Sequence, residues 1–175
     1  KKEYKRFFEM LKKKEEEGNV LSNKDHEKFK KLKKKAEEEI INDCQVVVTT
    51  CISSFDKRLN SFRFPIVLID EATQACESEC ILPLLHGAKH AIIVGDHCQL
   101  GPVVLCKNAA KAGLKMSLFE RLVKLKIKPH MLQVQYRMHP KLSEFPSNTF
   151  YDVNLQNGVN SDERIYFNVN FPWPN

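Results

Sequence analysis

Two adjacent carboxylates, Asp70 and Glu71, follow directly on the apolar residues 65–69 (PIVLI). An apolar run of this kind is typical of a buried strand, and the ligands of parallel sheets bind where the strands end. At such an edge the first acid can hold Mg²⁺, and the second can orient or activate a water that attacks a γ-phosphate. The alternative is that both acids lie in a solvated surface loop.

A second polar segment, residues 95–102 (GDHCQLGP), follows the apolar residues 91–94. Glycines near both ends of this segment allow its backbone to approach a ligand closely. The side chain of Gln99 can both donate and accept a hydrogen bond, so it can contact a phosphate oxygen or an attacking water. Gln99 is therefore the candidate functional residue of this segment.

A third polar segment, residues 135–140 (QYRMHP), follows the mainly apolar residues 131–134. Arg137 can stabilise charge that develops on a transferring phosphoryl group, and Tyr136 offers a flat aromatic face to an adenine ring. Taken singly, an arginine or a tyrosine in a loop is usually a surface residue. Polar residues after three successive apolar runs instead predict one phosphate-binding edge of a sheet.

Short strands and helices that alternate along the chain would position these residues. The predicted strands are rich in β-branched residues and do not alternate with polar ones, which favours burial on both faces of a parallel sheet. They are residues 45–50, 65–70, 91–95 and 131–135. The predicted helices between and after them are residues 77–85, 107–112, 117–125 and 140–150. This alternation predicts a three-layer α/β fold.

The first 42 residues differ from the rest and predict a helical hairpin. Residues 3–17 and 24–42 are the expected helices, with residues 18–19 (GN) as a stop and residues 22–25 (SNKD) as the N-cap segment of the second. The apolar stripe of the second helix consists of Phe29, Leu32, Ala36 and Ile40. The interleaved charges favour a solvated hairpin, and a basic arm near nucleic acid is the alternative.

The charge and the composition limit the class of protein. The 175 residues are 42% hydrophobic, which is enough for one globular core, and the net charge is +6. Residues 1–39 alone contribute +4 of this charge, so bulk charge is a weak argument for binding of nucleic acid. The apolar runs are far shorter than the roughly 20 residues of a membrane helix, and no signal peptide opens the chain. Because it starts with a lysine, we expect a piece of a longer protein.

Six cysteines are irregularly spaced, which is typical of reduced thiols in a cytoplasmic protein rather than of a disulfide scaffold. Cys76 and Cys80, with His97 and Cys98, suggest a zinc site as a minor alternative. No C-x-x-C pair, the usual start of a zinc site, is present in the sequence.

Three segments carry a resemblance to a known family. IDEATQ (residues 69–74), GDHCQLGPVV (95–104) and QYRMHP (135–140) are similar to motifs II, III and IV of the superfamily 1 RNA and DNA helicases. Longer stretches, including LQNGV (residues 155–159), resemble the up-frameshift branch of this family, which acts in nonsense-mediated mRNA decay. The resemblance covers about residues 25–175.

The resemblance implies a partial RecA-like domain of the P-loop NTPase type, with a three-layer α/β/α arrangement and a mainly parallel sheet. Residues 1–42 would be a helical insertion on it. Residues 43–175 would be the C-terminal part of the first RecA-like domain, ending at the connector to a second one. The activity implied is ATP-driven 5′-to-3′ translocation on single-stranded RNA, with ATP and Mg²⁺ as cofactors.

The resemblance also assigns roles to the candidate residues. Asp70 would bind Mg²⁺, Glu71 would be the catalytic base, and Gln99 would couple the γ-phosphate to the rest of the motor. Tyr136 would stack on adenine and Arg137 would contact the γ-phosphate. Contacts with single-stranded RNA are implied at Thr50, Cys51, Pro102 and Val103. The implied partners are RNA or possibly DNA, the second RecA-like domain and other decay factors, with no membrane.

The sequence contains no Walker A loop, G-x-x-x-x-G-K-[ST], which cradles phosphates in P-loop proteins. In the resembled family this loop precedes the helical insertion, so we expect the 175 residues alone to be inactive as an ATPase. Two alternatives stay open: a non-catalytic module whose hairpin docks a protein partner, and a sister helicase that acts on DNA. The first is disfavoured because Asp70, Glu71, Gln99 and Arg137 are all present.

Overall fold

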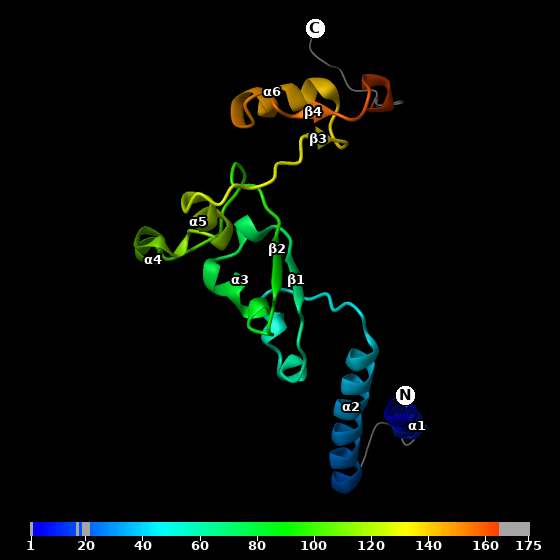
Figure 1. Ribbon diagram of the computed structural model, residues 1–175. Helices are drawn as coiled ribbons and strands as arrows, with labels where there is room; N and C mark the ends of the chain where they lie inside the picture. Colours follow the sequence, from blue (N-terminus) through cyan, green and yellow to red (C-terminus); the bar gives the residue numbers. More distant parts are fainter. Residues whose placement is uncertain (1, 17, 19–21, 165–175) are drawn as a thin grey trace. The chain divides into compact units, whose positions relative to one another are not determined.

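The computed structural model describes residues 2–16, 18 and 22–164 of the 175-residue chain. The chain divides into two compact units, Lys1–Arg121 and Leu122–Asn175. The first unit contains the hairpin and one parallel pair of strands, and the second contains another parallel pair beside a helix (Figure 1). The chain is thus of the α/β class, as the sequence predicts.

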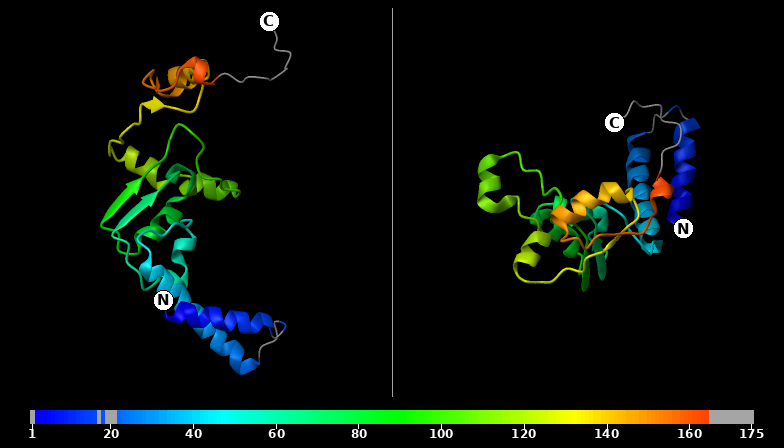
Figure 2. Two further views of the ribbon diagram at one scale, coloured as in Figure 1. Left: turned by 90° about the vertical axis from the view of Figure 1, so that its right-hand side faces the viewer. Right: turned by 90° about the horizontal axis from the view of Figure 1, so that it is seen from above.

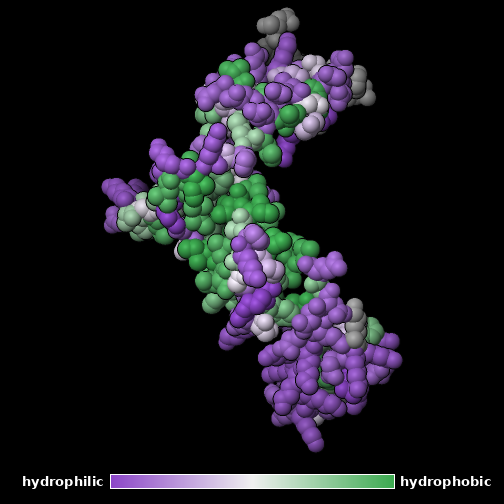
Figure 3. Space-filling view, viewed as in Figure 1, coloured by the Kyte–Doolittle hydropathy of each residue, from purple (hydrophilic) through white to green (hydrophobic). Residues whose placement is uncertain are grey.

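The predicted hairpin is confirmed by helices α1 (Lys2–Glu16) and α2 (Asn23–Asp43). The hydroxyl of Ser22 caps α2 by accepting a hydrogen bond from the backbone N–H of Asp25, at 3.2 Å. Phe7 of α1 packs on Phe29 of α2, with ring centroids 5.2 Å apart. Residue 17, the last of the first predicted helix, lies outside the described residues. The face of the hairpin that Figure 3 shows is mostly hydrophilic.

Strands β1 (Ile66–Ile69) and β2 (His90–Ile93) pair in parallel, with Ile66 opposite His90 and Ile69 opposite Ile93 (Figure 2). Helix α3 (Glu77–Leu84) connects them, as the alternation of strands and helices predicts. Burial along β1 alternates instead of being continuous: Ile69 is 4% exposed, whereas Leu68 is 61% exposed. The prediction that these strands are buried on both faces is therefore wrong within the described residues.

The predicted strand at residues 45–50 is also wrong. This segment forms no strand, and the side chains of Val46 and Val48 are 75% and 92% exposed. A strand needs a neighbour to satisfy its backbone N–H and C=O groups, and the described residues offer this segment none. A β-branched composition alone therefore does not make a strand here.

The predicted strand at residues 131–135 is reduced to β3 (Val134–Gln135). It pairs in parallel with β4 (Gln156–Asn157), a strand that the sequence analysis did not predict. Within the described residues β1–β2 and β3–β4 are two separate sheets, not the single sheet that was expected. The polar composition of β4 hides it from a pattern based on apolar runs.

Helix α6 (Pro140–Phe150) matches its predicted bounds, and the ring Nδ1 of His139 caps it by accepting from the N–H of Lys141. The other predicted helices are α4 (Lys107–Ala109), which continues into the π-turn η4 (Ala110–Leu114), and α5 (Leu118–Lys124). Short turns complete the chain: η1 (Ser53–Phe55), η2 (Lys57–Leu59), η3 (Ala72–Gln74) and η5 (Ser161–Arg164). None of the helices in the described part has the length and apolar character needed to cross a membrane.

Candidate functional site

The two carboxylates lie where the chain leaves β1. Both Asp70 and Glu71 are exposed, and Oδ1 of Asp70 accepts a hydrogen bond from the backbone N–H of Glu71 at 3.0 Å. Glu71 has a left-handed backbone, with φ 51° and ψ 36°. For a residue with a Cβ this conformation costs about 1 kcal/mol, and such strain is concentrated at functional sites. The turn therefore presents both carboxylates at the end of the strand.

The Glu71 side chain is oriented by a neighbour that the sequence analysis missed. Nε2 of Gln74 donates to Oε2 of Glu71 at 3.0 Å, and the backbone N–H of Gln74 donates to the carbonyl of Glu71 at 2.9 Å. The three-residue spacing across η3 brings the two side chains to the same side of the turn. This spacing is the signal in the sequence that points to Gln74.

Backbone hydrogen bonds join the end of β1 to the end of β2. The N–H of Val94 donates to the carbonyl of Ile69, and the N–H of Ala72 donates to the carbonyl of Val94, both at 2.8 Å. The N–H of Asp96 reaches the Thr73 hydroxyl at 3.4 Å. The segment with the carboxylates and the segment with Gln99 are therefore held side by side, as the sheet-edge argument predicts.

A close approach at Gly95 makes this junction possible. A Cβ at position 95 would lie 2.9 Å from Cγ2 and 3.0 Å from the backbone N of Thr73. Thr73 is buried, so neither atom has room to move away. Gly95 is required for the space between the two segments, not for an unusual backbone conformation.

We expect the substitution Gly95→Ala to lower the free energy of unfolding by about 1–3 kcal/mol, because the added methyl overpacks the contact with Thr73. Urea denaturation followed by circular dichroism measures the change. Gly101→Ala is the matched control, because a Cβ at position 101 meets no atom within 4 Å. Equal stability of the two variants would contradict the close contact.

Asp96 organises the segment that carries Gln99. The Asp96 carboxylate accepts from Nε2 of Gln99 at 2.7 Å and from the backbone N–H of Cys98 at 2.9 Å. The exposed Gln99 amide is thereby held next to the junction with β1. Asp96, His97 and Cys98 also place their ligand atoms within 4.8 Å of one another, a grouping compatible with a metal ion in the described part of the chain. Of the four residues in the zinc alternative, His97 and Cys98 are members of this group, whereas Cys76 and Cys80 are not.

Tyr136 and Arg137 lie in the second unit, directly after β3, and both are exposed. The Gln135 side chain fixes the turn that presents them. Its Oε1 accepts from the backbone N–H groups of Arg137 and Met138 at 2.9 and 2.7 Å, and its Nε2 donates to the carbonyl of Met138 at 2.9 Å. Asp70, Glu71 and Gln99 thus share one unit, and Tyr136 and Arg137 share the other.

The four residues expected to contact RNA are all in the first unit. The Thr50 hydroxyl accepts from the N–H of Ser53 at 3.2 Å, and Cys51 is half-buried. Pro102 is buried, whereas Val103 is 86% exposed. Thr50 and Val103 are therefore the members of this set with the most accessible side chains.

Two thiols of the first unit have raised pKa values. Burial raises the pKa of Cys80 to about 11, and burial followed by the nearby charge of Glu79 raises the pKa of Cys51. The Sγ atom of Cys80 lies 3.8 Å from the carbonyl oxygen of Ala72, the residue after Glu71. A buried neutral thiol at this position acts as packing below the carboxylate turn.

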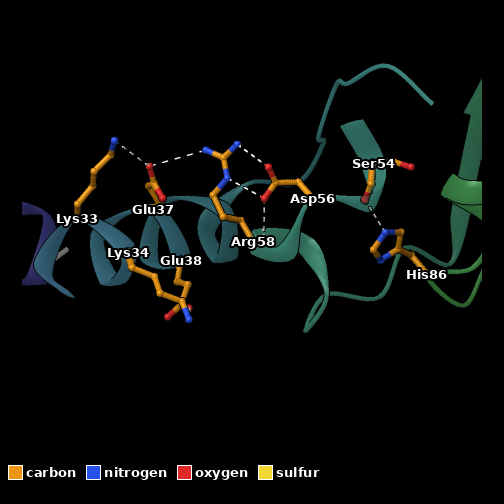
Figure 4. A network of polar contacts seen from close by, with 8 residues as sticks. All are labelled: Lys33, Lys34, Glu37, Glu38, Ser54, Asp56, Arg58 and His86. Carbon is orange, nitrogen blue, oxygen red and sulfur yellow. Dashed lines mark hydrogen bonds and ion pairs between the residues drawn. The ribbon is translucent and has the colours of Figure 1, made fainter. Parts of the chain in front are cut away.

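A polar network connects helix α2 of the hairpin to the following part of the first unit (Figure 4). Arg58 lies 2.9 Å from an oxygen of Asp56 and 3.7 Å from one of Glu37 in α2. The hydrogen bond and charge of the Arg58 guanidinium lower the pKa of Asp56 to about 2. The buried ring of His86 lies 2.7 Å from the carbonyl of Ser54, which ties the end of α3 to the segment after Cys51.

Comparisons with known proteins agree with these motifs. The family described as AAA domain matches residues 1–107, and a second family with the same description matches residues 114–174. The chain is 58% identical over 161 residues to "Regulator of nonsense transcripts 1 homolog" of Arabidopsis thaliana, which covers 92% of the chain and 13% of that relative.

Two yeast relatives give the same result. The chain is 56% identical over 165 residues to "ATP-dependent helicase NAM7" of Saccharomyces cerevisiae, and 54% identical over 157 residues to "ATP-dependent helicase upf1" of Schizosaccharomyces pombe. These matches cover 94% and 90% of the chain and 17% of each relative, so the chain spans less than a fifth of the length of these relatives. The chain therefore belongs to the AAA domain family and, within it, to the superfamily 1 helicases related to regulator of nonsense transcripts 1.

Proposed function

We propose that this chain is part of an ATP-dependent RNA helicase of nonsense-mediated mRNA decay, which couples hydrolysis of Mg-ATP to 5′-to-3′ movement along single-stranded RNA. The observation that supports this most is the junction of β1 and β2, where the carboxylates of Asp70 and Glu71 are fixed beside the segment of Gln99. The names of the relatives, which include two ATP-dependent helicases, agree with it.

The exposed groups at the end of β1 fit Mg-ATP. Mg²⁺ prefers carboxylate oxygens and is usually bound by one or two of them together with phosphates and waters. Oδ1 of Asp70 accepts one hydrogen bond, and among the described residues Oδ2 of Asp70 makes none, so Oδ2 is available as a ligand. When bound, Mg²⁺ neutralises charge on the β- and γ-phosphates.

Glu71 and Gln99 act on the two sides of the γ-phosphate. Oε2 of Glu71 accepts from Gln74, and among the described residues Oε1 makes no hydrogen bond, so Oε1 is free to accept a proton from the attacking water. Gln99 is held by Asp96 and offers its amide to a phosphate oxygen. A change in this contact on loss of the phosphate would reach the β1–β2 junction through Asp96, whose N–H contacts the Thr73 hydroxyl.

Tyr136 and Arg137 of the second unit are also nucleotide-binding residues in this proposal. The ring of Tyr136 is 64% exposed and can stack on adenine, and the exposed guanidinium of Arg137 can pair with γ-phosphate oxygens. Residues 43–175 would be the C-terminal part of a first RecA-like domain, with residues 1–42 as its insertion. A second RecA-like domain and other decay factors would be the protein partners.

Single-stranded RNA would contact Thr50, Cys51, Pro102 and Val103 in the first unit. We place the protein in the cytoplasm on its cysteine usage, since the irregular spacing of its six cysteines is typical of reduced thiols. Contacts to the phosphodiester backbone carry little sequence information, so binding is expected to be tolerant of sequence.

ATPase assays of the full-length protein test the proposal. We expect single-stranded RNA to stimulate ATP hydrolysis at least about tenfold more than single-stranded DNA of the same sequence, because the 2′-hydroxyl is the group that distinguishes the two polymers. Equal stimulation by DNA would favour a DNA helicase, and no stimulation by either polymer would contradict coupling to a nucleic acid strand.

A further inference from the structure

The segment LQNGV, residues 155–159, has no role in the site described above, although it lies next to Tyr136 and Arg137. It includes strand β4, which pairs with β3 immediately before these two residues. The N–H of Gln156 donates to the carbonyl of Gln133 at 2.6 Å, and the N–H of Gly158 donates to the carbonyl of Gln135 at 2.9 Å. The ladder therefore fixes Gly158 beside the start of the Tyr136 turn.

The side chain of Asn157 extends this support to the turn itself. Its Oδ1 accepts from Nε2 of Gln135 and from the hydroxyl of Ser143 in α6, both at 2.6 Å. Gln135 in turn accepts from the backbone N–H groups of Arg137 and Met138. Asn157 thus sets the orientation of the Gln135 amide, and that amide fixes the backbone that presents Arg137.

Gly158 gives the Tyr136 ring its space. A Cβ at position 158 would lie 2.6 Å from Cδ1 and 2.7 Å from Cζ of Tyr136, too close for any real contact. The backbone of Gly158 is not in the left-handed region, so the glycine is needed for the ring and not for its own conformation. Tyr136 nevertheless stays 64% exposed, which leaves area for a second flat group.

Arg164 holds the same turn through its carbonyl groups. Its guanidinium donates from Nη2 to the carbonyl of Tyr136 at 2.5 Å and from Nε to the carbonyl of Arg137 at 3.2 Å. Hydrogen bonds from a charged donor are stronger than those between neutral groups. The Gln135 side chain therefore holds the backbone N–H groups of the turn, and the Arg164 side chain holds its C=O groups.

We propose that residues 156–158, together with Arg164, are a positioning element for Tyr136 and Arg137, and that Gly158 sets the place of the ring on which the purine base stacks. This inference rests on the proposed function. It assigns to Gly158 a part in the selection of the nucleotide base: a displaced ring loses the stacking that favours a large purine over a smaller pyrimidine.

The test uses ATPase kinetics of the full-length protein. We expect Gly158→Ala to raise the KM for ATP about tenfold, as expected for loss of base stacking, with a smaller effect on kcat. The preference for ATP over UTP, taken as the ratio of kcat/KM values, should fall by about the same factor. Tyr136→Ala should give the same change. The double variant Gly158→Ala with Tyr136→Ala should lose no more of the preference for ATP than Tyr136→Ala alone.

Val159→Ala is the matched control for loss of stability, because Val159 is buried next to Gly158 but does not touch the ring in any described contact. It should lower the melting temperature and leave the preference for ATP unchanged. If Gly158→Ala does not fold, Arg164→Ala replaces it in the test, because it changes an exposed side chain. Arg164→Ala should raise the KM for ATP several-fold, and Arg164→Lys should give a smaller rise in this KM.

These variants distinguish a failure of the positioning element from a failure of the nucleotide role of Tyr136. Suppose that Tyr136→Ala raises the KM for ATP, but that neither Gly158→Ala nor Arg164→Ala raises this KM more than Val159→Ala does. The positioning element is then wrong, and the nucleotide role of Tyr136 stands. If Tyr136→Ala leaves both the KM and the preference for ATP unchanged, the positioning element and the stacking role fall together, while RNA-stimulated hydrolysis would still support the helicase assignment.

Discussion

The substitution Glu71→Gln in the full-length protein is expected to lower kcat for ATP hydrolysis by about 10²–10⁴-fold, the usual contribution of a positioned general base. Glutamine keeps the length and volume of the side chain and faces the same left-handed backbone at position 71. It removes the carboxylate that accepts the proton, so the KM for ATP and the affinity for RNA should change by less than about threefold. RNA-stimulated release of phosphate and a separate RNA-binding titration measure the two effects.

Glu79→Gln is the matched control for this experiment. Glu79 lies in the same unit, and its carboxylate accepts from the backbone N–H of Cys76 as part of a capping box at the start of α3. A glutamine serves the capping box nearly as well, so kcat should be unchanged. A Glu71→Gln enzyme as active as the Glu79→Gln enzyme would remove Glu71 from the role of base.

The elements that sequence patterns predict best are those stabilised by their own residues. The hairpin follows from helical spacing and a local N-cap within residues 22–25, and the structure has both, with Ser22 as the cap. The pair of β1 and β2 follows from two apolar runs joined by a helix of suitable length. The run at residues 45–50 has the same composition but no neighbour to pair with in the described chain, so it is not a strand. Strand pairing depends on distant residues, and the composition of one segment does not contain that information.

The site shows the same division between local and distant information. The rule that ligands bind at strand ends places Asp70, Glu71 and Gln99 next to one another, and the junction of β1 and β2 agrees with it. The support for these residues could not be predicted in the same way. The contact of Gly95 with Thr73, and the contact of Gly158 with Tyr136, join residues about 20 positions apart. A glycine in a sequence indicates freedom or space, but only the fold shows which neighbour occupies that space.

Arg137→Ala in the full-length protein is the second large effect that we expect. A cation that pairs with the γ-phosphate oxygens acts mainly on charge that develops in the transition state, and such an arginine contributes about 10³-fold or more to kcat. The guanidinium of Arg137 is exposed, and the turn that carries it is held through its backbone by Gln135 and Arg164, so removal of the side chain leaves the support intact. RNA affinity should therefore change by less than about threefold while kcat falls by about 10³-fold.

The salt dependence of RNA binding distinguishes this role from an RNA contact. If Arg137 paired with an RNA phosphate, Arg137→Ala would weaken binding and reduce the slope of log affinity against log salt by about 0.7 for a single strand. Lys141→Ala removes an exposed cation from the first turn of α6 and serves as the charge-matched control. An unchanged slope in both variants, with kcat lost only in Arg137→Ala, assigns the arginine to the nucleotide. Equal loss of turnover and RNA affinity in Arg137→Ala would assign it to the RNA, because one side chain would then stabilise the bound strand and not the transition state.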